Sequence, residues 1–354
     1  QFINEPDLNG YDNEEKIRWY AKTFDDIFIR KKNTIIGGIS NSSSANIKNK
    51  EYYDLLFKYS NNIFNVATHI YDYENQNKQN EKFIKTNENF KNNINSNGGF
   101  VNKYLTEYGI HTANGIDDIS QAQKILQQTV LGDKYNYTKV IQYNFWSTGN
   151  DKTFSENNFG LITCDYKPRV SYYVMKNYYE NTNGAEYIGQ INIKEGLEAH
   201  VYDKDGKPKI IVWSTDTNST STIDYTDFKA SDLYGKEIEN TNGKLEITTA
   251  PIYLDNISNK YFYQAIANTI TTGYNEFNEK FSNEIERIPE LKTEIANLNT
   301  FAEKLTTTEN LDENIAELKT EEHFNLGSTI INAYNNEKLN IEYVKLSSML
   351  DYLN

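Results

Sequence analysis

The chain has 354 residues and a net charge of −14, and 38% of its residues are hydrophobic. This apolar content supports packed cores, and the length favours two or three domains because one domain usually has about 150 residues. The negative charge, with no basic stripe to offset it, argues against nucleic acid as a partner. No apolar run reaches the roughly 18 residues that a membrane span requires. A single cysteine excludes an internal disulfide framework.

Residues 1–183 alternate short apolar runs with helical periods, which is the pattern of βα units on a parallel sheet. The expected strands are Phe2-Ile3, Thr34–Ser40, Phe64–Tyr71, Val101–Glu107 and Lys139–Trp146. A helix is expected after each of them. Asp12 and Glu15 have the spacing of a capping box for the first helix, and Pro168 is expected in the first turn of the last. Gly37 and Gly38 predict close packing at a strand end.

The hydrophobic period changes to two from about residue 184, so residues 184–258 are expected to form a small antiparallel β-sandwich. Asp205-Gly206 and Asn242-Gly243 are dipeptides that suit type I′ hairpin turns. Residues 259–354 have helical periodicity, interrupted at Pro289, with 8 basic and 16 acidic side chains. We expect an acidic helical bundle there.

Two expected strands end in a carboxylate, Glu5 and Glu107, which lie 102 residues apart in the sequence. The ends of parallel strands build the active sites of α/β proteins, so both side chains can meet at one mouth of the sheet. Two neighbouring carboxylates can divide the work of acid and nucleophile, which is the chemistry of glycosidases. Taken singly, either glutamate has an equally good interpretation as a solvated residue at a strand end.

Four further side chains are candidates for substrate contacts. His69 and Tyr71 are two residues apart on one expected strand and therefore project to the same side; the alternative is a buried histidine and a core tyrosine. Asn4 can bind a sugar hydroxyl. Trp146 can stack on a sugar ring, or it can serve as a wedge between the sheet and a helix.

Other chemical signals are weak. His111 is not part of a His-Glu-x-x-His helix, so a zinc site is not expected there. His200 and His323 are expected at the surface, and Cys164 is expected to be a small buried residue. The sequence contains no phosphate-binding loop. We expect neither a metal nor a cofactor.

Four short motifs that contain these candidate residues, taken together, resemble the second half of a clan A glycoside hydrolase. They are Asn4-Glu5-Pro6, His69-x-Tyr71, Thr106-Glu107-x-Gly109 and Phe145-Trp146. The resemblance assigns them to strands four, six, seven and eight of a (β/α)8 barrel, and the stretch that follows, to residue 258, is similar to family 39 and its relatives. It implies hydrolysis with retention of configuration, Glu5 as acid/base and Glu107 as nucleophile.

The leading hypothesis is therefore a secreted or cell-surface bacterial glycoside hydrolase that acts on a carbohydrate and is seen as a fragment. Residues 1–183 would be the C-terminal half of a (β/α)8 barrel, with a missing N-terminal half required for closure. The strands at 34–40 and 139–146 are expected near exposed edges. One alternative is a non-catalytic carbohydrate-binding or cell-surface protein built on a degenerate barrel, and another is a structural surface-layer element built on the helical tail.

Overall fold

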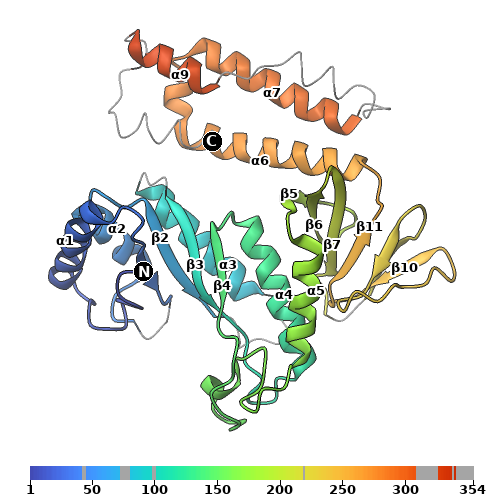
Figure 1. Ribbon diagram of the computed structural model, residues 1–354. Helices are drawn as coiled ribbons and strands as arrows, with labels where there is room; N and C mark the ends of the chain where they lie inside the picture. Colours follow the sequence, from blue (N-terminus) through green and yellow to red (C-terminus); the bar gives the residue numbers. More distant parts are fainter. Residues whose placement is uncertain are drawn as a thin grey trace. The chain divides into compact units, whose positions relative to one another are not determined.

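The computed structural model describes residues 1–41, 45–71, 80–97, 101–217, 220–307, 326–336 and 339 (Figure 1). The chain separates into two compact units. The first contains Gln1–Asn181 and residues 216–219, and the second contains Thr182–Thr215 and Thr220–Asn354. Within the described ranges, no helix combines the length and apolar character that a membrane span requires. His323 lies outside the described residues.

The first unit is a parallel sheet with its crossover helices. Its strands lie side by side in chain order, β1-β2-β3-β4, and Phe2 adds a single parallel bridge to Ile36 at the β1 side. The strands are β1 (Ile36–Ile39), β2 (Asn65–Ile70), β3 (Asn102–Tyr108) and β4 (Lys139–Gln142); the helices are α1 (Glu14–Arg30), α2 (Asn49–Tyr59), α3 (Glu81–Ser96), α4 (Asp118–Lys134), η1 (Ser155–Asn158) and α5 (Val170–Thr182). The predicted βα order is thereby confirmed.

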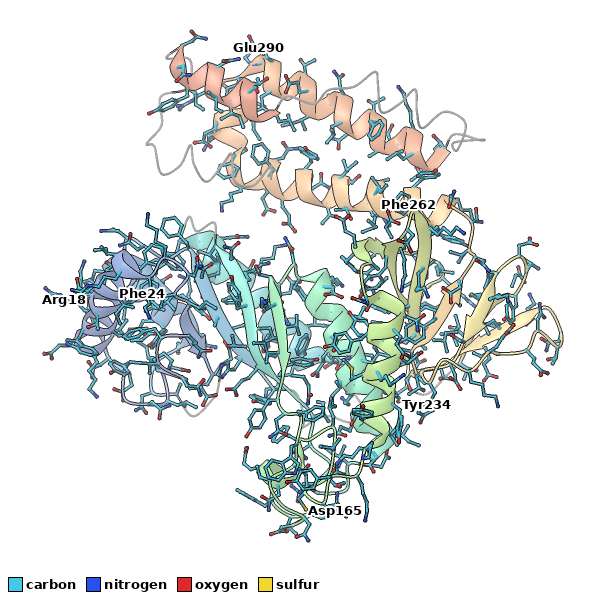
Figure 2. The ribbon with its side chains drawn as sticks, in the orientation of Figure 1. Arg18, Phe24, Asp165, Tyr234, Phe262 and Glu290 are labelled. Atoms are coloured by element: carbon cyan, nitrogen blue, oxygen red, sulfur yellow. The ribbon has the colours of Figure 1, made fainter. Side chains whose placement is uncertain are left out.

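Packing between strands and helices follows the apolar periodicity. The α1 helix buries one face that includes Phe24, whereas Arg18 lies on its outer side (Figure 2). The β3 strand contacts two helices through Tyr108, whose ring packs against Phe83 of α3 and whose hydroxyl is 2.6 Å from Thr129 Oγ1 of α4. All residues of β1 and β2 are buried, as expected for parallel strands covered on both faces.

Of the two strands expected near exposed edges of the sheet, only β4 is exposed. The β4 strand is exposed at alternate positions, which fits an edge strand, but β1 is buried throughout. The buried state of β1 has a physical cause, since the Phe2 segment pairs with it and the Phe2 ring stacks on Tyr20 of α1.

Two helix starts were assigned wrongly from the sequence. The N-cap of α1 is Asn13, whose side chain accepts a hydrogen bond from the Lys16 backbone N–H, whereas Asp12 pairs with the Lys16 ammonium. Asn and Asp are equally good caps, so the sequence could not choose between them. Pro168 forms a bridge with Ile162 before α5 begins at Val170, so it is not in the first helical turn.

The second unit contains antiparallel strands followed by helices. One sheet has the order β5-β6-β7-β11-β9 and a smaller one pairs β10 with β8. The strands are β5 (Glu186–Ile191), β6 (Leu197–Lys204), β7 (Lys207–Ser214), β8 (Ser221–Asp224), β9 (Lys229–Ser231), β10 (Lys244–Ile247) and β11 (Ile252–Asp255). The chain thus combines a parallel sheet, an antiparallel sheet and C-terminal helices, as the sequence predicted at this level.

One of the two expected hairpin turns forms. Asp205 and Gly206 join β6 to β7 with φ values of 57° and 77°, as a type I′ turn requires. Asn242-Gly243 instead ends the long connection from β8 to β10, and only Gly243 has a positive φ. The dipeptide predicts a tight hairpin only when the strands beside it pair with each other, and here its partner strand lies further back in the chain.

The burial of two side chains, His200 and Cys164, differs from what the sequence predicted. His200 of β6 is fully buried rather than exposed, because its ring stacks on Trp213 and its Nδ1 is 3.0 Å from the Tyr187 hydroxyl. Cys164 is half-buried in the segment before α5. Strand periodicity does not reveal which polar residue gains an aromatic neighbour across the sheet.

The helices of the second unit are α6 (Lys260–Ile285), α7 (Pro289–Thr307) and α9 (Leu326–Asn335). Pro289 opens α7, where its missing N–H leaves no helical hydrogen bond unmade. The three helices share an apolar core that includes Phe281, Ile295 and Ile330. The α6 helix also bonds to the sheet, since Thr269 Oγ1 donates to the Ile188 carbonyl at 2.8 Å.

Candidate active site

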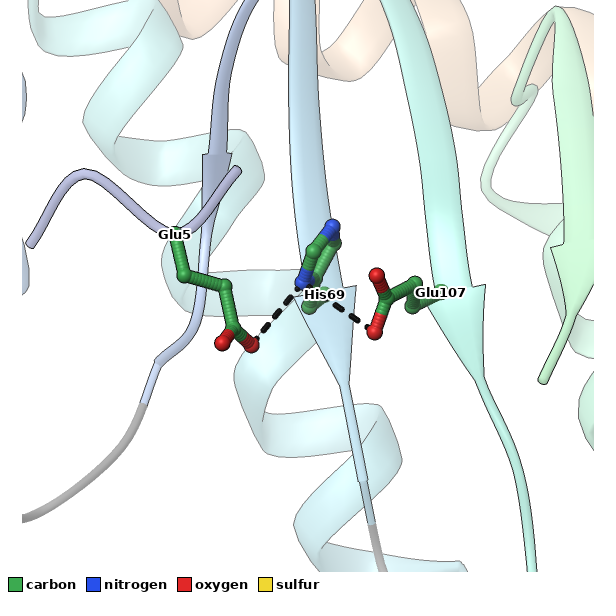
Figure 3. Close-up of side chains that lie close together, drawn as sticks. All are labelled: Glu5, His69 and Glu107. Atoms are coloured by element: carbon green, nitrogen blue, oxygen red, sulfur yellow. Dashed lines mark hydrogen bonds and ion pairs between the residues drawn. The ribbon is translucent and has the colours of Figure 1, made fainter. Parts of the chain in front are cut away.

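Glu5, His69 and Glu107 lie together at the carboxyl ends of the parallel strands (Figure 3). His69 belongs to β2 and Glu107 to β3, and the two residues are direct partners in the register of these strands. Glu5 follows the Phe2 bridge at the β1 side of the sheet. The three side chains therefore meet at the carboxyl end of one sheet, although β1 lies between the Glu5 segment and β2.

The imidazole of His69 lies between the two carboxylates. Its Nδ1 is 3.0 Å from Glu5 Oε1 and 3.6 Å from Glu107 Oε2, and one carboxylate oxygen of Glu5 lies within 4.8 Å of one of Glu107. The His69 side chain is fully buried, whereas those of Glu5 and Glu107 are 25% and 26% exposed. Both carboxylates are therefore accessible at the site, whereas the histidine that contacts them is buried.

A change of register in β3 aims Glu107 into the site. Thr68 pairs with Leu105, but the next residue, His69, pairs with Glu107, so Thr106 is an extra residue in β3. Because side chains alternate between faces, one extra residue changes which side chain stands beside His69. Without this irregularity Thr106 would occupy the position of Glu107.

Tyr71 supports the Glu107 carboxylate. Its hydroxyl donates to Glu107 Oε2 at 2.7 Å, and burial, together with the Glu107 charge, raises the pKa of Tyr71 well above its ordinary value. The phenol therefore remains protonated and continues to donate at neutral pH. His69 and Tyr71 project to the same side of β2, as their spacing predicted.

Close packing around His69 depends on glycine. Gly38 has φ +78°, and a Cβ at this position would lie 3.2 Å from His69 Nε2 and 1.9 Å from the Gln1 side chain. A Cβ at Gly37 would lie 2.7 Å from the Ala67 carbonyl oxygen. The close approach predicted for these two glycines is confirmed, and it allows the imidazole to be buried under the site.

A cavity of about 510 Å³ opens above the carboxylates. It is lined from every strand end of the sheet, by the segment after Phe2 and by α3. Its lining residues are Asn4, Glu5, Leu8, Ser40, Asn41, Ile70, Tyr71, Lys82, Thr86, Glu107, Tyr143, Glu156 and Phe159.

Of the residues expected to contact substrate, Asn4 lines the cavity and Trp146 does not. The β4 strand ends at Gln142, so Tyr143 occupies the strand end and lines the cavity. Trp146 lies further along the chain, is 43% exposed and stacks on Tyr166 with ring centroids 5.6 Å apart. This segment extends beyond the carboxyl ends of the strands, where Asp165 is labelled (Figure 2).

Several residues of the cavity were missed by sequence reasoning. Ser40 and Asn41 follow β1 directly, so their position at a strand end was an available signal. Tyr143 donates to Glu156 Oε2 at 3.1 Å, and burial and the Glu156 charge raise the pKa of Tyr143. Glu156 lies in η1 and Lys82 in α3, and no local pattern assigns a helix residue to a distant cavity.

Glu5, His69 and Glu107 also have the composition of a cation site, because one donor atom from each lies within 4.8 Å of the others. Carboxylate and imidazole donors suit several divalent metals. In the structure these donors already face one another: His69 Nδ1 is at hydrogen-bond distance from Glu5, and Glu107 accepts from Tyr71. His69 and Tyr71 thus already provide hydrogen-bond partners for the two carboxylates.

Comparison with known proteins identifies the fold. No protein-family profile and no curated protein sequence matches the chain. Among solved structures, a family 39 glycoside hydrolase from Bacteroides cellulosilyticus WH2 is similar over 72% of this chain and 57% of its own, with 18% identity and a TM-score of 0.57. Over the matched part, this chain shares the fold of that glycoside hydrolase. The resemblance derived from the motifs is thus confirmed at the level of fold.

Other similar structures are also glycoside hydrolases. One is a family 86 β-porphyranase from Bacteroides plebeius, with 12% identity over 72% of this chain and 56% of that one and a TM-score of 0.49. Another is a family 30 endoxylanase from Clostridium papyrosolvens, with 12% identity, 72% and 64% coverage and a TM-score of 0.42. The chain spans less than two thirds of the length of each of these proteins.

Proposed function

We propose that this protein is a retaining glycoside hydrolase in which Glu107 is the nucleophile and Glu5 the acid/base. The observation that carries the proposal is the separation of the two carboxylates, whose oxygens approach within 4.8 Å across His69. Retaining enzymes hold their carboxyl groups about 5 to 5.5 Å apart, whereas inverting enzymes need about 6.5 to 9.5 Å to admit a water molecule.

The proposed reaction has two displacements. Glu107 attacks the anomeric carbon while Glu5 gives its proton to the glycosidic oxygen, which leaves as an alcohol. Glu5, now a carboxylate, then takes a proton from water as that water attacks the anomeric carbon and releases Glu107. The Tyr71 hydroxyl donates to Glu107 Oε2 and holds this carboxylate in place for the first step.

The remaining polar and aromatic candidates have binding roles in this proposal. Asn4 is exposed on the cavity wall beside Glu5 and can donate to a sugar hydroxyl of a polysaccharide or oligosaccharide. His69 contacts both carboxylates and fixes their positions relative to each other. Trp146 stacks on a sugar unit beyond the cavity, a role that its 43% exposure permits.

We further propose that the parallel sheet is the C-terminal half of a (β/α)8 barrel. Its described part has four strands and the Phe2 bridge, whereas a closed barrel needs eight strands. The β4 strand exposes Ile141, and Phe145 after it is 59% exposed. In this proposal the N-terminal half covers that edge, residues 184–258 form a β-sandwich and residues 259–354 form a helical bundle.

A polysaccharide substrate would place the enzyme outside the cell, either secreted or on a bacterial surface.

Stereochemistry tests this function. A protein in which the four further strands are present should hydrolyse an aryl glycoside with net retention, because two displacements at one carbon restore its configuration. Proton NMR during the first minutes of reaction reports the anomer released. Addition of EDTA should leave the rate unchanged, since the proposed steps use only proton transfer and carboxylate attack.

Three results would contradict this proposal. Release of the inverted anomer would exclude the nucleophile role of Glu107, and loss of activity with EDTA would favour metal chemistry at the same three side chains. Binding of a polysaccharide with no hydrolysis of any glycoside would favour the alternative, a non-catalytic carbohydrate-binding or cell-surface protein.

Residues 1–354 expressed alone should be inactive and prone to self-association. An unpaired edge strand with exposed apolar side chains invites pairing with another chain, and a half barrel supplies only part of a substrate site. Size-exclusion chromatography with light scattering and an aryl glycoside assay measure both properties. A monodisperse, active monomer would show that the half-barrel interpretation is wrong.

A further inference from the structure

The segment that carries Glu5 has a backbone that is unusual for its residues. Ile3 and Glu5 both have left-handed conformations, with φ values of 59° and 44°. Side chains with a Cβ rarely adopt this region, and β-branched isoleucine is especially disfavoured. Such conformations persist where surrounding contacts hold them in place, and they concentrate at functional sites.

Hydrogen bonds within the segment fix its internal shape. The Glu5 carbonyl accepts from the backbone N–H groups of Leu8 and Asn9, at 3.0 and 2.9 Å, and the Asn9 side chain donates to the Asn4 carbonyl at 2.9 Å. All these partners lie within the segment itself. They therefore define a turn but do not determine where the turn stands relative to the sheet.

Asp7 attaches this turn to β1. The side chain is 2% exposed, and its carboxylate accepts from the Ser40 backbone N–H at 3.1 and 3.2 Å and from the Ser40 hydroxyl at 2.6 Å. Ser40 follows the last residue of β1 and lines the same cavity as Glu5. The carboxylate thus connects the Glu5 turn to a strand end within the site.

A buried carboxylate is a costly way to make such a connection. Burial, with a smaller effect of the Glu5 charge, raises the pKa of Asp7 despite the hydrogen bonds from Ser40. A group with a raised pKa contributes most to stability when it is protonated, at low pH, and that contribution is lost as pH rises through its pKa. At neutral pH the ionised carboxylate is therefore held at this position at a cost in stability.

We propose that Asp7 is a positioning residue for the acid/base Glu5, a role that rests on the proposed function. By holding the turn against Ser40, Asp7 sets the distance at which the Glu5 carboxyl faces His69 and Glu107. Displacement of a reacting group by about 1 Å costs about 10²-fold in rate. That loss falls on proton donation to the leaving group, because Glu5 is the group that moves.

The experiment uses the complete enzyme and a series of aryl glycosides whose leaving groups differ in pKa. Asp7→Ala should lower kcat/KM about 10²-fold for a phenol of high pKa and less than about fivefold for dinitrophenol, which leaves without a proton. Asp7→Asn retains an oxygen that accepts from Ser40 and should recover most of the loss. Ser40→Ala removes the hydroxyl but keeps the backbone donor, so its effect should be intermediate.

Asp25→Ala is the matched control, because Asp25 of α1 also accepts a hydrogen bond from a serine hydroxyl, that of Ser60, at a place away from the cavity. It should leave the dependence on leaving group unchanged. Equal losses for every leaving group in Asp7→Ala and Asp7→Asn, or the same pattern in Asp25→Ala, would overturn the positioning role while leaving the glycosidase function intact. A wild-type enzyme that hydrolyses no glycoside would instead contradict the proposed function and this inference together.

Discussion

Replacement of Glu107 by Gln should lower kcat/KM of the complete enzyme by roughly 10⁵-fold or more, in line with the loss of other catalytic nucleophiles. The amide retains the size of the side chain and its contact with the Tyr71 hydroxyl, but it cannot form the glycosyl ester. All aryl glycosides should lose activity similarly, because the first displacement is removed whatever the leaving group.

Intact-mass spectrometry checks the same prediction without turnover. An activated 2-fluoro glycoside should label the wild-type enzyme with one sugar and leave Glu107→Gln unlabelled. Glu156→Gln is the matched control, because Glu156 is another carboxylate of the cavity wall. This variant should lose about tenfold or less in kcat/KM. Labelling of the Glu107→Gln enzyme, or an equal loss in Glu156→Gln, would assign the nucleophile elsewhere.

Replacement of Glu5 by Ala should produce a loss that depends on the leaving group. Substrates that require protonation should lose about 10²- to 10⁴-fold in kcat/KM, the usual contribution of a general acid. A dinitrophenyl glycoside should keep its kcat/KM but show a lower kcat, because no base then activates water in the second displacement. Steady-state kinetics with both substrates measure the two effects separately.

Azide distinguishes this role from a structural one. As an anion that needs no general base, it should raise kcat of Glu5→Ala with the activated substrate and yield a glycosyl azide of retained configuration. The wild-type rate should not respond to azide. Uniform losses across aryl glycosides, with no azide product, would show that Glu5 is not the acid/base.

Much of the architecture followed from local patterns. Parallel strands buried on both faces appear in a sequence as short apolar runs, and β1 and β2 lie where such runs predicted them. The β3 strand, which is less buried, also lies where it was predicted. The Asp205-Gly206 turn was predictable because it depends on two adjacent residues that tolerate positive φ. Patterns that depend on a distant partner failed, as for Asn242-Gly243 and for buried His200.

Local patterns were enough to place Glu5 and Glu107 at strand ends of one parallel sheet, about three βα units apart, and His69 and Tyr71 on one side of a strand. Both conclusions rest on fixed periods along the chain. That Glu107, rather than Thr106, lies beside His69 could be learned only from the folded chain, because the extra residue in β3 is defined by its pairing with β2. The tertiary structure also brought Ser40 to Asp7 and set the carboxylate separation, since contacts between residues far apart in the sequence depend on how the strands pack and not on any local period.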